Sequence, residues 1–116
     1  MKTMCDIQAH PAEFLPDDLK NFHGGEGELI SRRHLDDNNK ITRAVLSPGS
    51  SIGKHTHSGT SEVIFVLSGT GKMYINDEVE VLTAGDCHYC PEGSSHSFVN
   101  DGSEDLIFHA VVPNHK

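Results

Sequence analysis

Three histidines and a glutamate occur at spacings that could hold a transition metal. His55 and His57 are separated by one residue, and Glu62 follows after four more. Side chains at i and i+2 of a strand project from the same face, so both imidazoles would point the same way. A turn would then bring the Glu62 carboxylate alongside them, and His96 begins a later strand. Three imidazoles and one carboxylate suit Mn, Fe, Co, Ni, Cu or Zn, with open positions left for water or substrate.

Each of these residues also has a simpler explanation. A single His-x-His pair on a strand is usually incidental, and a glutamate that opens an apolar strand is not diagnostic. The combination is more specific, and it predicts one divalent transition metal per chain. The ligand types leave the metal undetermined, because Cu, Ni and Zn outcompete Mn and Fe at almost any such site and availability in the cell decides.

Short β-strands are the elements that must position these residues. From residue 28 onward, short apolar runs alternate with turns of Gly, Pro, Asp, Asn and Ser, and no convincing helix is present. Strands are predicted at 28–35, 41–47, 51–57, 62–67, 72–76, 79–82, 87–90, 96–99 and 106–112. Their spacing of roughly 8–12 residues favours a β-sandwich or barrel, so the expected fold class is all-β.

The first 27 residues differ from the rest of the chain. Prolines at positions 11 and 16 interrupt any helix, and residues 23–27 form a glycine-rich hinge. This segment has too few apolar residues to fold alone. We therefore divide the chain into an N-terminal arm, 1–27, and a single β-domain, 28–116, with the arm packing on the domain or on a second subunit.

Composition narrows the classes of function. The chain of 116 residues carries 9 Lys and Arg against 17 Asp and Glu, a net charge of −8. This balance, without a basic cluster, argues against nucleic acid as a partner. The absence of any long apolar run argues against a membrane span, and the first residues lack a secretion signal, so we expect a cytoplasmic protein.

The spacing of the candidate ligands and turn glycines resembles the cupin superfamily. Gly49-x5-His55-x-His57-x4-Glu62-x6-Gly69 resembles its first motif, and Gly85-x5-Pro91-x-Gly93-x2-His96-x3-Asn100 resembles its second. The resemblance covers residues 41–112. It implies a jelly-roll β-barrel of six to eight strands, with His55, His57, Glu62 and His96 as metal ligands. It also implies a homodimer, in which N-terminal strands are often exchanged.

Strand alternation suggests which other side chains face the metal. An inward Arg43 would hold a substrate carboxylate with two hydrogen bonds, although a surface arginine paired with acidic residues is the alternative. Phe98 shares the face of His96. Met73 and Tyr74 are adjacent, so one of them faces the cavity, and Tyr74 is our candidate for substrate binding together with Arg43 and Phe98.

Further histidines and two cysteines are less decisive. His88 and His109 are candidate catalytic acid–base groups, with His34 as another candidate, and a structural role is the alternative for each. His88 and Cys90 share one face of their strand, and Cys87 lies on the other. We therefore discount a zinc or redox role for the Cys87-x2-Cys90 pair and interpret Cys90 as a small apolar core residue. With Cys5, the cysteines are odd in number and form no disulfide framework.

Three classes of function remain. The favoured one is a metal-dependent enzyme that acts on a small oxygen-rich, carboxylate-bearing molecule. A redox metal would support dioxygenase or decarboxylase chemistry, and a redox-inert metal would support isomerase or lyase chemistry. The alternative is a protein that binds a sugar or carboxylate with the help of the metal and without turnover. A purely structural metal is disfavoured, because structural sites are usually closed by four tight ligands.

Overall fold

The computed structural model describes residues 15–16, 19–20 and 22–115, and almost every regular element in them is a β-strand. The strands of the β-domain are β3 (Glu28–Leu35), β4 (Asn39–Leu46), β5 (Ser51–Thr56), β6 (Glu62–Ser68), β7 (Thr70–Ile75), β8 (Glu78–Thr83), β9 (Cys87–Cys90), β10 (Ser95–Val99) and β11 (Leu106–Pro113). These are the nine strands predicted from the sequence, with ends shifted by at most two residues. The all-β fold class is confirmed. No helix among the described residues is long and apolar enough to cross a lipid bilayer.

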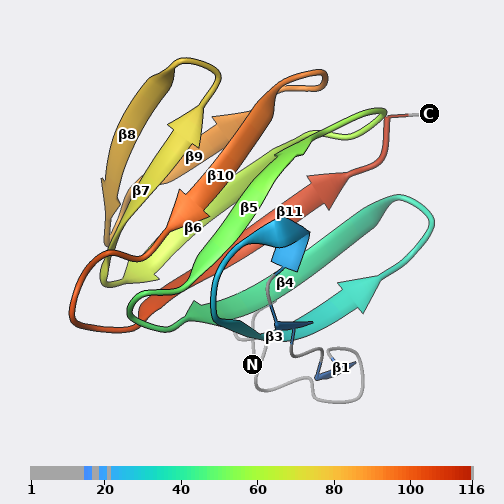
Figure 1. The fold of residues 1–116 in the computed structure, drawn as a ribbon. Coiled ribbons are helices and arrows are strands. Elements are labelled where there is room, and N and C mark those ends of the chain that lie inside the picture. The colour runs from blue at the N-terminus through green and yellow to red at the C-terminus, as the bar shows by residue number, and fades with distance from the viewer. Residues whose placement is uncertain (1–14, 17–18, 21, 116) are drawn as a thin grey trace.

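Two antiparallel sheets pack face to face in a jelly-roll arrangement (Figure 1). In the larger sheet the strand order is β1-β3-β4-β11-β6-β9, where β1 is the short strand Leu15–Pro16, and in the smaller sheet it is β5-β10-β7-β8. The hydrophobic core lies between them and is centred on Leu46, Met73 and Leu106, which are fully buried. The rings of Phe98 and Phe108 meet edge to face across this core, with their centroids 5.2 Å apart.

Burial alternates along each strand, as expected for strands that present one face to a core. In β11, Leu106, Phe108 and Ala110 are buried while the residues between them are half-buried. We call the side of the larger sheet that faces the smaller sheet its inner face, and the opposite side its outer face. This alternation decides which predicted side chains reach the site.

The described part of the arm packs on the domain of its own chain. Two short strands, β1 (Leu15–Pro16) and β2 (Leu19–Lys20), pair with β3, and a 3-10 turn, η2 (Phe22–Gly24), follows them. The arm then joins the smaller sheet through a hydrogen bond of 2.7 Å from the amide of Ser51 to the carbonyl of Glu26. Residues 1–14, including Cys5, lie outside the described residues, as does any exchange that they take part in.

Candidate metal centre

The backbone of the smaller sheet brings the three histidines together. His55 on β5 and His96 on β10 are direct partners in the antiparallel ladder. His57 lies just beyond β5, where its amide donates to the carbonyl of Ser94 at 3.0 Å and its carbonyl accepts from the amide of Gly93 at 2.7 Å. The turn before β10 therefore holds the backbone of His57 next to His96.

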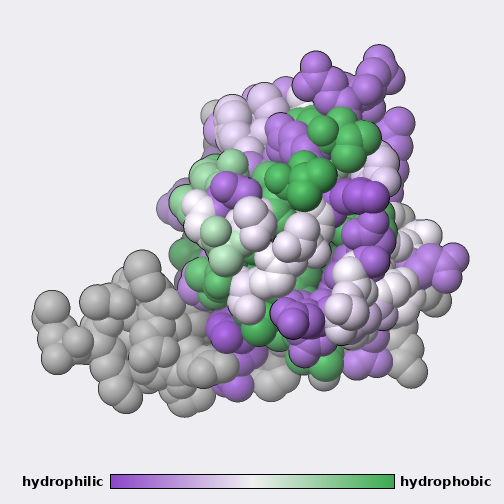
Figure 2. All heavy atoms as spheres, turned by 90° about the vertical axis from the view of Figure 1, so that its left-hand side faces the viewer, coloured by the Kyte–Doolittle hydropathy of each residue, from purple (hydrophilic) through white to green (hydrophobic). Residues whose placement is uncertain are grey.

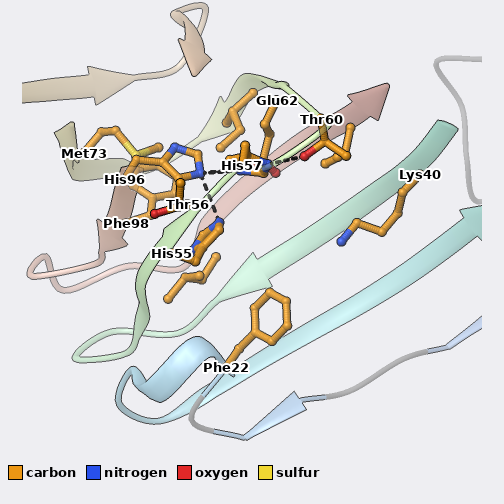
Figure 3. Close-up of a pocket in the computed structure, with 13 residues that line it drawn as sticks. Phe22, Lys40, His55, Thr56, His57, Thr60, Glu62, Met73, His96 and Phe98 are labelled. Carbon is orange, nitrogen blue, oxygen red and sulfur yellow. Dashed lines mark hydrogen bonds and ion pairs between the residues drawn. The ribbon is translucent and has the colours of Figure 1, made fainter. Parts of the chain in front are cut away.

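Glu62 completes the group from the larger sheet. His96 Nε2 lies 2.8 Å from Glu62 Oε1, 3.0 Å from His57 Nε2 and 3.1 Å from His55 Nε2 (Figure 3). One ligand atom from each of the four residues lies within 4.8 Å of the others, so the cluster could hold a metal ion. Borderline nitrogen donors with one carboxylate fit a divalent transition metal, and nothing in the donor set demands a particular one.

The Glu62 carboxyl is held in its charged form. Its side chain is largely buried, and burial raises its pKa, but hydrogen bonds from His57 and His96 outweigh that effect and bring the pKa down to about 2. A ligand must be deprotonated to bind a metal, so this carboxylate is ready to bind one at any physiological pH.

The second ring nitrogen of each histidine has a hydrogen-bond partner. Nδ1 of His55 lies 2.8 Å from the carbonyl of Gly53, and Nδ1 of His57 lies 3.0 Å from Thr60 Oγ1. Nδ1 of His96 lies 3.1 Å from Nε2 of His88. These contacts leave the Nε2 atoms turned toward one another, which is the orientation that a shared metal needs.

A cavity of about 250 Å³ opens in front of the cluster. Its apolar lining comes from Ile52, Ile64, Met73, Phe98 and Val112. Phe22 of η2 lines the mouth, and the Lys40 side chain extends from β4 into the space (Figure 3). This volume lies just below the usual range of ligand pockets, about 300 to 1,000 Å³, so the site suits a small molecule.

Comparison with known proteins decides the family. The model of the cupin domain matches residues 42–112. The chain belongs to the cupin family. The Oxalate-binding protein of Thermotoga maritima is 34% identical to this cupin over 118 residues, which cover 97% of this chain and 98% of that protein.

Solved structures of similar fold also support the assignment to the cupin family. The crystal structure of a predicted oxalate decarboxylase from Thermotoga maritima has a TM-score of 0.82 and 34% identity, covering 89% of this cupin and 95% of that chain. A Cupin 2 conserved barrel domain protein from Salinispora arenicola has a TM-score of 0.66 and 27% identity, covering 72% of this cupin and 74% of that chain.

The structure brings one of the three predicted substrate-binding residues to the cavity. Phe98 lines it, as expected. Arg43 lies on the outer face of β4, because alternation turns its neighbours Thr42 and Ala44 inward. Tyr74 also points outward, since the fully buried Met73 takes the inner position. Neither Arg43 nor Tyr74 is among the residues that line the cavity, and a role of either in substrate binding stays a prediction.

Tyr74 belongs instead to a partly apolar surface. It is 41% exposed and lies opposite Val79 in the pairing of β7 with β8, where Val79 and Val81 are also exposed. Figure 2 views the molecule from the side of β8 and shows apolar residues interspersed with hydrophilic ones on this face.

The two candidate acid–base histidines are also displaced from the cavity. His109 lies on the outer face of β11, between Arg43 on one neighbouring strand and Phe65 on the other. His88 is buried on the same face of β9 as Cys90, as expected, but its ring lies behind His96. Burial lowers the pKa of His88, and the hydrogen bond to Glu80 opposes this effect. A direct catalytic role for either histidine stays a prediction, without a position in the cavity to support it.

The two described cysteines are free thiols on opposite faces of β9, as expected from the sequence. Cys90 is fully buried, and burial, followed by the charge of Glu62, raises the pKa of its thiol to about 11. A thiol of that pKa is protonated and unreactive at neutral pH. Cys87 is exposed on the opposite face of β9.

Acidification is expected to destabilise this cupin through His109. Burial lowers its pKa below the ordinary 6.5, and the charge of Arg43 lowers it further. The unfolded chain therefore takes up the proton first. The stability that His109 contributes is complete above about pH 6.5 and is lost as the pH falls through its folded pKa. In urea unfolding, His109→Gln should lose less stability between about pH 7.5 and about pH 5 than the parent protein. An equal loss in both would contradict this assignment.

Lys40 and Glu80 are among the residues near the centre that were not predicted from the sequence. Lys40 lines the cavity, and Glu80 contacts His88 at 2.7 Å. The spacing of Lys40 from Ala44 places the two on the same face of a strand, but the sequence does not indicate that this face is the inner one. Glu80 carried no signal, since its contact is with a residue of the other sheet.

Proposed function

We propose that this cupin binds a small dicarboxylate, with oxalate as the first ligand to test, between a divalent metal at the His55/His57/Glu62/His96 centre and the side chain of Lys40. The observation that carries the proposal is the Lys40 side chain facing the cavity in front of the cluster. The relatives named for oxalate support it.

Charge within the cavity favours an anion of two charges. When bound, a divalent ion supplies two positive charges and Lewis acidity toward a carboxylate oxygen, and metal-bound histidines are neutral. Glu62 removes one of these positive charges and Lys40 adds another. The site therefore carries a net charge of about two positive, which a dicarboxylate neutralises.

The other lining residues restrict the ligand. Phe22, Phe98 and the aliphatic side chains exclude water from most of the cavity wall. Their side chains offer no hydrogen bonds to the many hydroxyls of a sugar. The uncharged polar side chains of the lining, Thr56 and Thr60, lie near the histidines at one end of the cavity. A compact ligand with charged ends fits this distribution better than a polyhydroxylated one.

Substitution of Lys40 tests the binding proposal. Isothermal titration calorimetry of oxalate into the manganese-loaded protein should give a dissociation constant about 10- to 100-fold larger for Lys40→Met than for the parent, because a charge-assisted hydrogen bond is lost. Formate, which has one carboxylate, should lose much less affinity.

Lys54→Met is the matched control. Lys54 is exposed on β5, beside His55, so the same substitution changes the protein's net charge equally without altering the cavity. Its affinity for oxalate should match that of the parent. Unchanged oxalate affinity in Lys40→Met would remove Lys40 from the site, and no oxalate binding by the parent would remove the ligand class.

The ammonium group of Lys40 also favours a second candidate, oxalate decarboxylation. In that reaction the C–C bond of oxalate breaks, CO₂ leaves, and the electron pair left on the remaining carbon takes a proton to give formate. Lys40 is a proton source facing the cavity and outside the metal-ligand set. Formate production from ¹³C-oxalate, followed by NMR and abolished in Lys40→Met, would establish turnover. Binding without formate would leave the protein as a carboxylate binder.

A further inference from the structure

The side chains of Glu80 and His88 form a hydrogen-bonded chain behind the metal centre. Glu80 Oε1 lies 2.7 Å from His88 Nδ1, and His88 Nε2 lies 3.1 Å from His96 Nδ1. The ring planes of His88 and His96 are inclined by 25°, with their centroids 5.3 Å apart. Both histidines are almost completely buried, whereas Glu80 reaches the surface.

The hydrogen bonds from Glu80 through His88 to His96 connect the two sheets. Glu80 lies on β8, which ends the strand order of the smaller sheet, and His88 lies on β9, which ends that of the larger sheet. Glu80 pairs with the buried Met73 in the ladder, so its side chain starts from the inner side of β8. A surface carboxylate is thus connected through one buried imidazole to a candidate metal ligand.

We propose that Glu80 and His88 are positioning residues that fix the tautomer and ring orientation of His96, so that its Nε2 presents a lone pair to the metal. The inference rests on the metal centre of the proposed function, but not on its carboxylate ligand.

Hydrogen-bond chemistry gives the chain one direction. An ionised carboxylate accepts and cannot donate, so the proton of His88 lies on Nδ1 and points to Glu80. A neutral His88 then has a lone pair on Nε2, which accepts from Nδ1–H of His96. The remaining nitrogen of His96, Nε2, faces the other ligands and is free of a proton when it binds the metal. Partners of this kind, once removed, typically cost a site about 10- to 100-fold in metal affinity.

Two substitutions of His88 separate positioning from packing. His88→Leu fills the space without an acceptor, and His88→Gln places an amide oxygen within reach of the same proton of His96. We expect zinc affinity, measured by competition with a chromogenic chelator, to fall about 10- to 100-fold in His88→Leu and to be largely restored in His88→Gln.

A spectroscopic readout accompanies the affinities. Long-range ¹H–¹⁵N NMR of the zinc-loaded parent should show His96 protonated at Nδ1 and bound through Nε2. In zinc-loaded His88→Leu, the Nδ1 proton of His96 should exchange with solvent faster than in the zinc-loaded parent, because it no longer has its acceptor on His88. Without metal, the melting temperatures of the variants should stay close to that of the parent, so that the loss of zinc affinity does not come from unfolding.

Glu80 provides a test that does not depend on a buried substitution. Glu80→Ala should weaken zinc binding about three- to tenfold by freeing the tautomer of His88, whereas Glu78→Ala, at an exposed position of the same strand, should not. Parent affinity in both His88→Leu and Glu80→Ala, or equal loss in the Leu and Gln variants of His88, would overturn the proposal. All of these titrations omit carboxylates, so failure here leaves the oxalate proposal standing, and failure to bind oxalate leaves this one standing.

Discussion

Replacing His96 by alanine is expected to remove most of the metal that this cupin binds. His96 Nε2 lies within 3.1 Å of a ligand atom on each of the three other residues, so its loss opens the centre of the cluster. After loading with Mn²⁺, Co²⁺ or Zn²⁺ and gel filtration, elemental analysis should fall from about one ion per chain to below about a tenth. His57→Ala should behave in the same way.

The same substitution is expected to remove stabilisation by metal. An ion present at about 100 times its dissociation constant stabilises the folded state by about 2.7 kcal/mol, which the variant would no longer gain. The melting temperature of the parent should therefore rise on addition of metal, and that of His96→Ala should not. His34→Ala, in which a half-buried histidine beside Asp36 is removed, serves as the control and should bind metal like the parent. Unchanged metal content in both His57→Ala and His96→Ala would end the assignment of this site.

The metal ligands could be predicted from sequence because their positions depend on local geometry and fixed spacing. His55 and His57 share a face through the period of the strand, and Glu62 needs only a short turn to reach them. The nine strands of the domain were predictable for a similar reason, since each is a short run bounded by turn residues.

The residues on the inner face of β4 explain why the sequence suggested an inward Arg43, whereas the structure has it on the outer face. Lys40 and Thr42 occupy inner positions because they line a cavity, while Ile41 and Val45 take the outer ones. The usual pattern of apolar residues inward is therefore reversed over this part of the strand, and alternation alone cannot identify the inner set.

Contacts between the two sheets could not be predicted from the sequence, for a different reason. That His88 and Cys90 share one face of β9 was predicted correctly, but the distance of His88 from His96 was not predicted. That distance, and the contact with Glu80 on β8, depend on how the edges of the two sheets meet. Strand periodicity specifies a face of one sheet and carries no information on which strand of another sheet lies opposite.

Asn100→Ala is expected to lower the free energy of unfolding by about 3–5 kcal/mol, the largest effect on stability among these predictions. Asn100 is fully buried, and its Nδ2 donates to the carbonyls of Leu46 at 2.7 Å and Glu104 at 2.8 Å. Its Oδ1 accepts from the amide of Gly102 at 3.0 Å. Alanine would leave three backbone groups without this partner, and the melting temperature should fall by about 10–20 °C.

The effect should be confined to stability, because Asn100 ties the end of β4 to the loop before β11 and contacts none of the four candidate ligands in the hydrogen bonds described. At low temperature, where the variant is folded, it should bind as much metal as the parent. Asn38→Ala, at an exposed turn, should change stability by less than about 0.5 kcal/mol. A variant as stable as the parent would contradict the structural role of Asn100. Loss of metal without loss of stability would instead place this residue in the metal centre, and the second motif would then supply the site with more than His96.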